Sequence, residues 1–190
     1  MTAASVPDRD PFQVVDTPRS SGTDWPAAVH RVLRAAAVRQ VAVVPDAGLA
    51  RLITLCESDP ALRVVRLTSE EEGVALLAGA WLGGEKGVLL MQSSGTGNCI
   101  NMLGLPLACR FPLLMLVTMR GETGETNPAQ IPMGSATGRV LKAMGVPVSR
   151  VEDAEHVAGV VAVALERAFA TESPEAVLIA QRVLGFKAFR

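Results

Sequence analysis

The sequence contains no tyrosine and few other aromatic residues, with five phenylalanines and two tryptophans among 190 residues. Its acidic and basic residues nearly balance, giving a net charge of −1 at pH 7 and a pI near 6.1. Proteins that bind nucleic acids usually carry a basic surface and aromatic side chains that stack on bases. We therefore expect no nucleic-acid partner.

The sequence also lacks a membrane span and a secretory signal. Its most apolar region, residues 99–117, is interrupted by two prolines, an asparagine and an arginine and so is too polar for a transmembrane helix. The first residues include charges at positions 8–10 and no apolar segment of the kind that signal peptides carry. These absences predict a protein that does not associate with membranes.

Cysteine and histidine are both scarce. The three cysteines, Cys56, Cys99 and Cys109, show no C-x-x-C spacing, which indicates free thiols in a reducing compartment, most simply as small core residues. The two histidines, His30 and His156, fall in helical patterns without other ligands at metal-binding spacing. The sequence therefore predicts a cytoplasmic protein with no metal site on this chain.

Apolar residues, in contrast, are abundant. They make up 49% of the sequence, and the mean hydropathy is +0.31. This is high for a monomer of this size, because a small monomer must cover much of its surface with polar groups. We expect apolar surface to be buried against another chain in an obligate oligomer.

The sequence divides into a short tail and one domain. Residues 1–22 are rich in Pro, Ser, Thr and Asp without periodicity and are expected to form a flexible tail. From residue 23 onward, apolar runs typical of strands alternate with helical patterns to residue 190. The expected strands are 40–44, 62–67, 87–91, 112–118, 146–151 and 176–181, and the helices between and beside them include 47–57, 70–82, 97–109, 131–144 and 154–171.

This alternation predicts an α/β fold, with a six-stranded mostly parallel sheet and helices on both faces. In such sheets ligands bind at the carboxyl ends of the strands. The segments that should hold the site are therefore 45–46, 68–72, 92–98 and 118–133.

Residues 68–101 combine an acidic cluster with a glycine-rich segment. Three glutamates, residues 70–72, open a helix, and Ser93-Ser94-Gly95-Thr96-Gly97 follows the strand after it. Glycines before a helix can bind phosphate through free N–H groups, although a plain strand-to-helix turn has the same composition. The segment is neither a Walker A motif nor G-x-G-x-x-G, because Asn98, Cys99 and Ile100 follow Gly97.

Spacing connects these features to a known family. Gly79, Ser94, Gly95 and Gly97 lie 9, 24, 25 and 27 residues after Glu70, a pattern that resembles the pyrimidine-binding (PYR) domain of thiamin diphosphate enzymes. The segment MQSSGTGN is similar to one in phosphonopyruvate and sulfopyruvate decarboxylases. The segments EEEGVALLAGAWLGGEK, RG at 120–121 and PAQIPMG at 128–134 resemble the α subunit of sulfopyruvate decarboxylases.

The resemblance implies that one glutamate activates the cofactor by hydrogen bonding to N1′ of its aminopyrimidine. The spacing selects Glu70, whereas a shift of one residue would select Glu71. An acidic run also favours a helix N-terminus through the helix dipole, but that explanation does not account for the spacing. Glu70 is therefore the predicted catalytic residue, with Glu71 as the alternative.

Further site residues follow from the same resemblance. The expected cofactor-binding residues are Glu70, Gln92, Ser94, Gly95, Gly97 and Asn98. Asn98 could equally serve as a helix-start residue. Arg120 lies in a loop at a strand end, where it could contact an anionic group of the substrate or form a surface or interface ion pair. Gln130 lies in the segment that resembles PAQIPMG and is a candidate for substrate contact.

The resemblance also defines what the sequence lacks. Thiamin diphosphate enzymes bind the diphosphate and Mg²⁺ through a PP domain with a G-D-G segment, and no G-D-G occurs here. We therefore expect a PP-domain β subunit as partner, in an α2β2 or higher assembly that acts on a small 2-oxoacid such as sulfopyruvate or phosphonopyruvate. The alternatives are a carboligase or other lyase subunit, and a non-catalytic regulatory or binding subunit.

Overall fold

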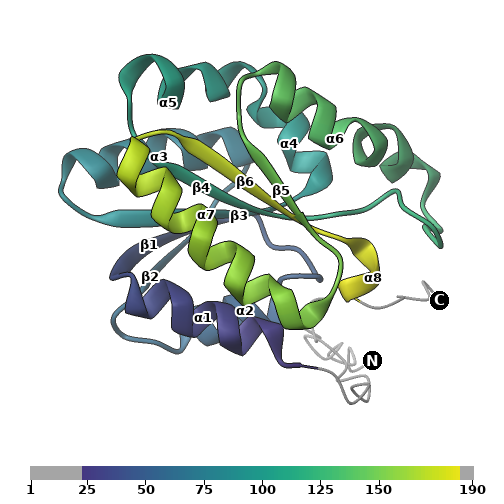
Figure 1. Ribbon diagram of the computed structural model, residues 1–190, viewed down its shortest axis with the longest axis horizontal. Helices are drawn as coiled ribbons and strands as arrows, with labels where there is room; N and C mark the ends of the chain where they lie inside the picture. Colours follow the sequence, from purple (N-terminus) through teal and green to yellow (C-terminus); the bar gives the residue numbers. More distant parts are fainter. Residues whose placement is uncertain (1–22, 185–190) are drawn as a thin grey trace, which may run out of the picture.

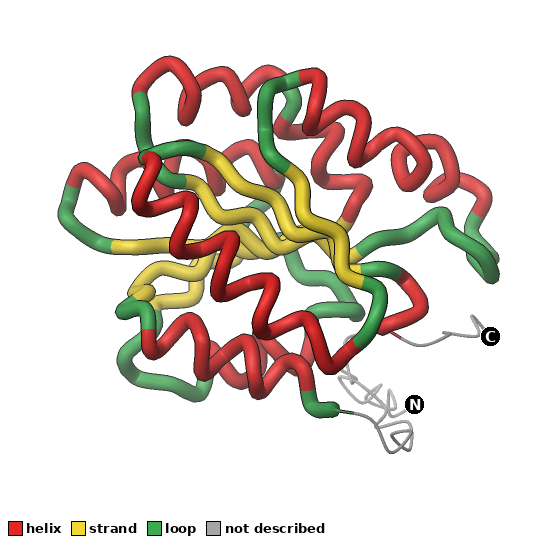
Figure 2. The backbone as a smooth tube through the Cα atoms, in the orientation of Figure 1, coloured by secondary structure: helices red, strands yellow, loops and turns green. Residues whose placement is uncertain are grey.

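The computed structural model describes residues 23–184, so the expected tail at residues 1–22 lies outside the described residues, as do residues 185–190. Strands and helices alternate along this part of the chain (Figure 1 and Figure 2). The strands are β1 (Val38–Val43), β2 (Arg63–Arg66), β3 (Lys86–Gln92), β4 (Leu113–Thr118), β5 (Val148–Val151) and β6 (Pro174–Ile179). The helices are α1 (Trp25–Ala35), α2 (Ala50–Glu57), α3 (Glu70–Leu82), α4 (Ser93–Cys99), α5 (Gly104–Cys109), α6 (Ile131–Ala143), α7 (Val157–Thr171) and α8 (Gln181–Leu184), with short 3₁₀ turns η1 (Asn101–Leu103), η2 (Pro128–Gln130) and η3 (Ala154–His156).

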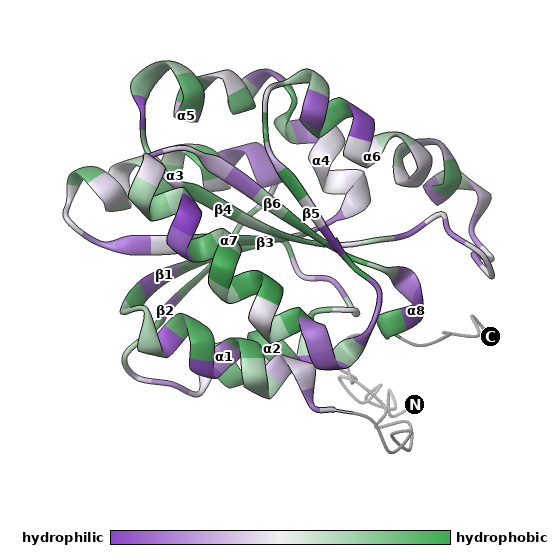
Figure 3. Ribbon diagram, in the orientation of Figure 1, coloured by the Kyte–Doolittle hydropathy of each residue, from purple (hydrophilic) through white to green (hydrophobic). Residues whose placement is uncertain are grey.

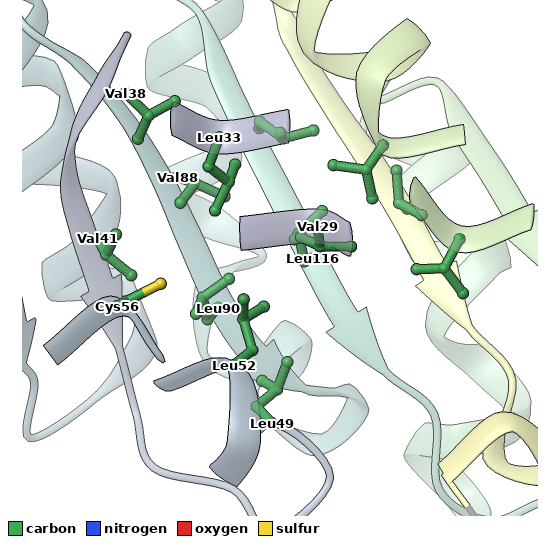
Figure 4. Close-up of a cluster of buried hydrophobic side chains, with 14 of the residues drawn as sticks. Val29, Leu33, Val38, Val41, Leu49, Leu52, Cys56, Val88, Leu90 and Leu116 are labelled. Carbon is green, nitrogen blue, oxygen red and sulfur yellow. The ribbon is translucent and has the colours of Figure 1, made fainter. Parts of the chain in front are cut away.

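The six strands form one sheet in the order β2-β1-β3-β4-β6-β5, and every pair of neighbours is parallel. Helices α1, α2 and α7 pack on one face of the sheet, as Figure 4 shows for α1 and α2. Helices α3, α4 and α6 pack on the other face. The predicted α/β fold is confirmed.

The central strands explain why the sequence shows apolar runs instead of alternation. In β3, Val88 and Leu90 point into the core beneath α1, α2 and α7, whereas Leu89 and Met91 point into the core beneath α3 and α4. Because both faces are covered by helices, every such position is buried. The hydropathy colouring makes the apolar centre of the sheet visible (Figure 3).

The topology also indicates where a ligand site should lie. After β1 the chain passes to α2 on one face, whereas after the neighbouring strand β3 it passes to α4 on the other face. A crevice opens at the carboxyl ends of two parallel strands whose connections diverge in this way. The carboxyl ends of β1 and β3 therefore mark the expected location of the site.

The glycine-rich segment after β3 is a helix and not the turn that the sequence predicts. The structure begins helix α4 at Ser93, so Gly95 and Gly97 lie inside a helix, and neither has a positive φ. The helix expected over 97–109 is divided into α4, η1 and α5. The short helix α8 was not predicted. Among residues 23–184, no helix has both the length and the apolar composition needed to cross a bilayer.

Candidate active site

Glu70 is the first residue of α3 and is buried, with 6% of the residue exposed. Its Oε2 accepts a hydrogen bond of 2.8 Å from Asn98 Nδ2 on α4. Among the described residues, no donor reaches its Oε1. A negative charge at the N-terminus of a helix is stabilised by the helix dipole. The structure thus holds a carboxylate in place and leaves one of its oxygens available.

The other two glutamates of the cluster have local partners instead. Glu71 is partly exposed and accepts a hydrogen bond from Ser69 Oγ, which holds the pKa of the Glu71 carboxyl below its usual value. Glu72 is exposed and accepts a hydrogen bond of 3.0 Å from the Thr68 backbone N–H. Both therefore act as residues of a helix N-terminus, and Glu70 is the one that faces α4.

Gly95 makes room for the Glu70 carboxylate. A Cβ atom added at Gly95 would lie 2.2 Å from Glu70 Oε1 and 2.3 Å from Glu70 Cδ. This is closer than any real contact, so a side chain at position 95 would displace the carboxylate. Gly97 contacts a different neighbour, with the Met133 sulfur 3.3 Å from its ideal Cβ position, and Gly79 has open space around it.

The two glycines of α4 allow a matched test of this contact. Gly95→Ala is expected to lower the free energy of unfolding by about 1–3 kcal/mol, because the added methyl group overpacks against Glu70. Gly97→Ala is expected to be neutral or slightly stabilising, because alanine favours a helix by about 1 kcal/mol and the Met133 side chain can move. Urea unfolding of both variants measures the difference. Equal effects would show that Gly95 is not required for the Glu70 position.

A hydrogen-bonded group at the carboxyl ends of β1, β3 and β4 contains Gln92 and Ser94. Ser94 Oγ donates to Gln92 Oε1 at 2.7 Å, and Gln92 Nε2 donates to Asp46 Oδ1 at 2.8 Å. Asp46 Oδ2 also accepts from Thr118 Oγ1 at 2.8 Å. The structure therefore places two of the predicted cofactor-binding residues, Gln92 and Ser94, at the start of α4 and connects them to an aspartate from the loop after β1.

Arg120 forms an ion pair within its own loop. Its guanidinium donates two hydrogen bonds of 2.6 Å to Glu125, whose side chain is 2% exposed. The same guanidinium holds the pKa of the Glu125 carboxyl far below its usual range. Of the two possibilities that the sequence leaves open, the structure contains the ion pair. A substrate anion would have to compete with Glu125 for this guanidinium.

Gln130 lies at the other end of the loop, in η2. Its Oε1 atom is buried and has no hydrogen-bond donor among the described residues. Buried acceptors are nearly always paired with protein or water, so this carbonyl oxygen can accept a hydrogen bond from a further group. Thr96 Oγ1 in α4 is also buried and unpaired within residues 23–184.

The remaining sequence predictions concern cysteines and metals. Cys56 and Cys99 are buried, as expected, and burial raises the pKa of each thiol to about 12, which makes both unreactive. Cys109 is exposed, so the prediction of a core position is wrong for that residue. Within the described part of the chain, no group of three or more His, Cys, Asp and Glu side chains could hold a metal ion.

Four residues that make hydrogen bonds at the site carry no motif by which the sequence identifies them: Asp46, Thr118, Glu125 and Gln181. Asp46 and Thr118 lie in segments that the strand pattern identified as sheet ends, so their position could be anticipated. Their contacts could not be, because the partners are 72 residues apart in the sequence. Glu125 pairs with Arg120 only because the loop folds back on itself.

Comparisons with known proteins give two kinds of relative, and no family model matches the chain. The chain is 38% identical over 125 residues to sulfopyruvate decarboxylase subunit alpha of Methanothermobacter thermautotrophicus, covering 65% of this chain and 76% of that protein. The corresponding subunit of Methanococcus maripaludis is 34% identical over 153 residues, covering 80% and 92%. Phosphonopyruvate decarboxylase of Streptomyces viridochromogenes is 41% identical over 118 residues, which cover 61% of this chain and 30% of that longer protein.

A solved structure shows the same fold. The 2-oxoglutarate:ferredoxin oxidoreductase from Magnetococcus marinus superposes with a TM-score of 0.66, covering 95% of this chain and 33% of that chain. The sequence identity of 18% is low, so this likeness concerns the fold alone.

Proposed function

The chain belongs to the family of sulfopyruvate decarboxylase α subunits, and from this membership we propose that it is the PYR subunit of a thiamin diphosphate-dependent 2-oxoacid decarboxylase. The proposed substrate is a three-carbon 2-oxoacid with a second anionic group, such as sulfopyruvate or phosphonopyruvate. The observation that carries the proposal is the buried Glu70 carboxylate, held through one oxygen by Asn98 and available through the other.

The residues around Glu70 fit the aminopyrimidine end of the cofactor. Thiamin diphosphate supplies an electron sink for the carbanion that decarboxylation produces. In the proposed site Glu70 Oε1 would hold a shared proton at N1′ of the aminopyrimidine, and the Asn98 amide would fix the orientation of the carboxylate. The absence of a side chain at Gly95 leaves this carboxylate in place. Gln92, Ser94 and Gly97 are proposed to border the same end of the cofactor.

The rest of the cofactor is proposed to lie on a second polypeptide. The sequence has no G-D-G segment, and we propose that a PP-domain β subunit holds the diphosphate and Mg²⁺ in an α2β2 or larger cytoplasmic assembly. Exposed apolar residues support a partner surface on this chain: Leu105 and Leu107 of α5 are 39% and 40% exposed. The relatives named as α subunits agree with such a division.

On the substrate side, Gln130 is the better supported of the two candidates. Its buried Oε1 lacks a donor among the described residues, whereas the Arg120 guanidinium is paired with Glu125. We propose that Gln130 contacts the substrate and that Arg120 contributes by holding the loop.

Co-expression with a G-D-G-containing partner from the same genome tests the proposal. The purified complex, supplied with thiamin diphosphate and Mg²⁺, is expected to release CO₂ from sulfopyruvate or phosphonopyruvate and much less from pyruvate. Product analysis distinguishes decarboxylation from carboligation. Failure to form a complex, or a complex without turnover of any 2-oxoacid, would contradict the proposed function.

A further inference from the structure

Asp46 accepts hydrogen bonds from three segments at the carboxyl edge of the sheet. Its Oδ1 accepts from Gln92 Nε2 at the end of β3. Its Oδ2 accepts from Thr118 Oγ1 at the end of β4, at 2.8 Å, and from the Gly48 backbone N–H, at 2.9 Å. All three partners donate, so position 46 requires an acceptor at both oxygens. An ionised carboxylate meets this requirement.

The charge of Asp46 fixes the orientation of the Gln92 amide. Because a carboxylate only accepts, Gln92 must turn its NH₂ group toward Asp46 and its carbonyl oxygen toward Ser94. The Ser94 hydroxyl then donates its single hydrogen to Gln92 Oε1 at 2.7 Å. Ser94 is exposed, so the part of its oxygen that faces outward carries lone pairs and no hydrogen.

We propose that Asp46 is a positioning residue that, through Gln92, fixes Ser94 as a hydrogen-bond acceptor toward the bound ligand. The site then favours a ligand that presents an N–H or O–H donor at this point. The identity of this ligand, thiamin diphosphate or the 2-oxoacid, rests on the proposed function. The direction of the Asp46–Gln92–Ser94 hydrogen bonds is independent of the proposed function.

Asp46→Asn reverses the direction of the hydrogen bonds from Ser94 to Gln92 and from Gln92 to position 46, and it leaves no polar group unpaired. The new amide oxygen can still accept from Thr118 and Gly48, and the new NH₂ group replaces Oδ1. Gln92 must then turn its amide over, and its NH₂ group donates to Ser94, which becomes free to present its hydrogen outward. The variant is expected to fold with an unchanged midpoint of unfolding, and in complex with the partner subunit to lose roughly tenfold in kcat/KM, the effect of one hydrogen bond.

Two further variants distinguish this role from a merely structural one. Gln92→Glu alone places a second carboxylate against Asp46 and is expected to lower kcat/KM at least as much as Asp46→Asn. The double variant Asp46→Asn/Gln92→Glu exchanges the carboxylate and the amide, so that Ser94 again donates to position 92. It is expected to recover to within about threefold of the wild-type value, since the lost hydrogen bond is restored.

Ser94→Ala supplies the matched control. It removes the acceptor oxygen and is expected to lower kcat/KM by a similar factor of about ten. Adding Asp46→Asn to Ser94→Ala should change kcat/KM by less than about twofold, because both substitutions act through the Ser94 oxygen. No recovery in the double variant, or a full additional loss in the Ser94→Ala background, would overturn the proposal.

NMR of the full chain, ¹⁵N-labelled at glutamine, tests the direction of the hydrogen bonds without any activity. The Gln92 side-chain signal is identified by its disappearance in Gln92→Glu. It is expected to move upfield in Asp46→Asn, because a bond to a charged acceptor is replaced by a weaker bond to a hydroxyl. An unmoved signal would refute the arrangement. An inactive wild-type complex would contradict the proposed function, and the NMR result would still decide the role of Asp46.

Discussion

Glu70→Gln is expected to lower decarboxylation by the assembled enzyme by roughly a hundredfold or more and to leave the chain folded. Glutamine has the shape of glutamate, and its amide oxygen can still accept the hydrogen bond from Asn98. An amide cannot share a proton with a ring nitrogen as a carboxylate does. The variant therefore removes proton transfer at this position while keeping the packing against Gly95.

Glu71→Gln is the matched control, because Glu71 lies beside Glu70 in the first turn of α3 and accepts a hydrogen bond from the nearby Ser69 hydroxyl. It is expected to stay within about twofold of the wild-type rate, since a partly exposed charge contributes little. CO₂ release by each complex, together with the midpoint of thermal unfolding, gives the comparison. Normal activity of Glu70→Gln with loss in Glu71→Gln would show that the alternative glutamate is the catalytic one.

The sequence predicts the framework of the fold well because both faces of the sheet are covered. Apolar runs such as Leu113–Thr118 are continuous, and the helices between them are long enough to show their own pattern. The predicted bounds of α3, residues 70–82, agree with the structure. Where the pattern was interrupted, at residues 97–109, the predicted single helix was wrong.

The glycines of α4 show what spacing alone cannot reveal. Glycine is most simply predicted in a turn, because it tolerates positive φ. Gly95 and Gly97 instead adopt helical geometry, and Gly95 is needed because the Glu70 carboxylate lies where its side chain would be. The reason is a tertiary contact between two helices, which local sequence does not encode.

Side-chain pairing is the other part of the site that the sequence could not supply. Arg120 was a candidate for anion binding because it follows a strand end, but its partner depends on the path of the loop after it. Asp46 and Gln92 are 46 residues apart and meet only because β1 and β3 are neighbours in the sheet. Residue types and strand ends can be predicted, whereas the partner of each polar group follows from the strand order or from the path of a loop.

The Glu125 carboxylate connects the loop after β4 to the rest of the domain. Besides the two bonds from Arg120, it accepts hydrogen bonds from the backbone N–H groups of Gly121 and Asn127, at 3.1 and 2.9 Å, and from Gln181 Nε2 of α8, at 3.1 Å. Breaking a buried ion pair by removing one partner leaves the other charge uncompensated. Glu125→Ala is therefore expected to lower the free energy of unfolding by about 3–5 kcal/mol at pH 7, as measured by urea unfolding.

An exposed ion pair provides the control for the loss of unfolding free energy in Glu125→Ala. Glu57 pairs with Arg66, whose side chain is 62% exposed, and Glu57→Ala is expected to cost less than about 1 kcal/mol. Similar losses in the two variants would show that burial does not strengthen the Arg120–Glu125 pair.

Acid should remove the contribution of Glu125 even without a mutation. Because Arg120 and the backbone N–H groups depress the pKa of Glu125 in the folded chain, the unfolded chain binds a proton at a higher pH than the folded chain does. The stabilisation is therefore complete above the ordinary carboxyl pKa of 4.5 and declines as the pH falls below it. The difference in unfolding free energy between the wild type and Glu125→Gln should accordingly narrow from pH 7 to pH 3. A difference that stays constant over this range would mean that the charge of Glu125 does not hold the loop, and that only the shape of its side chain does.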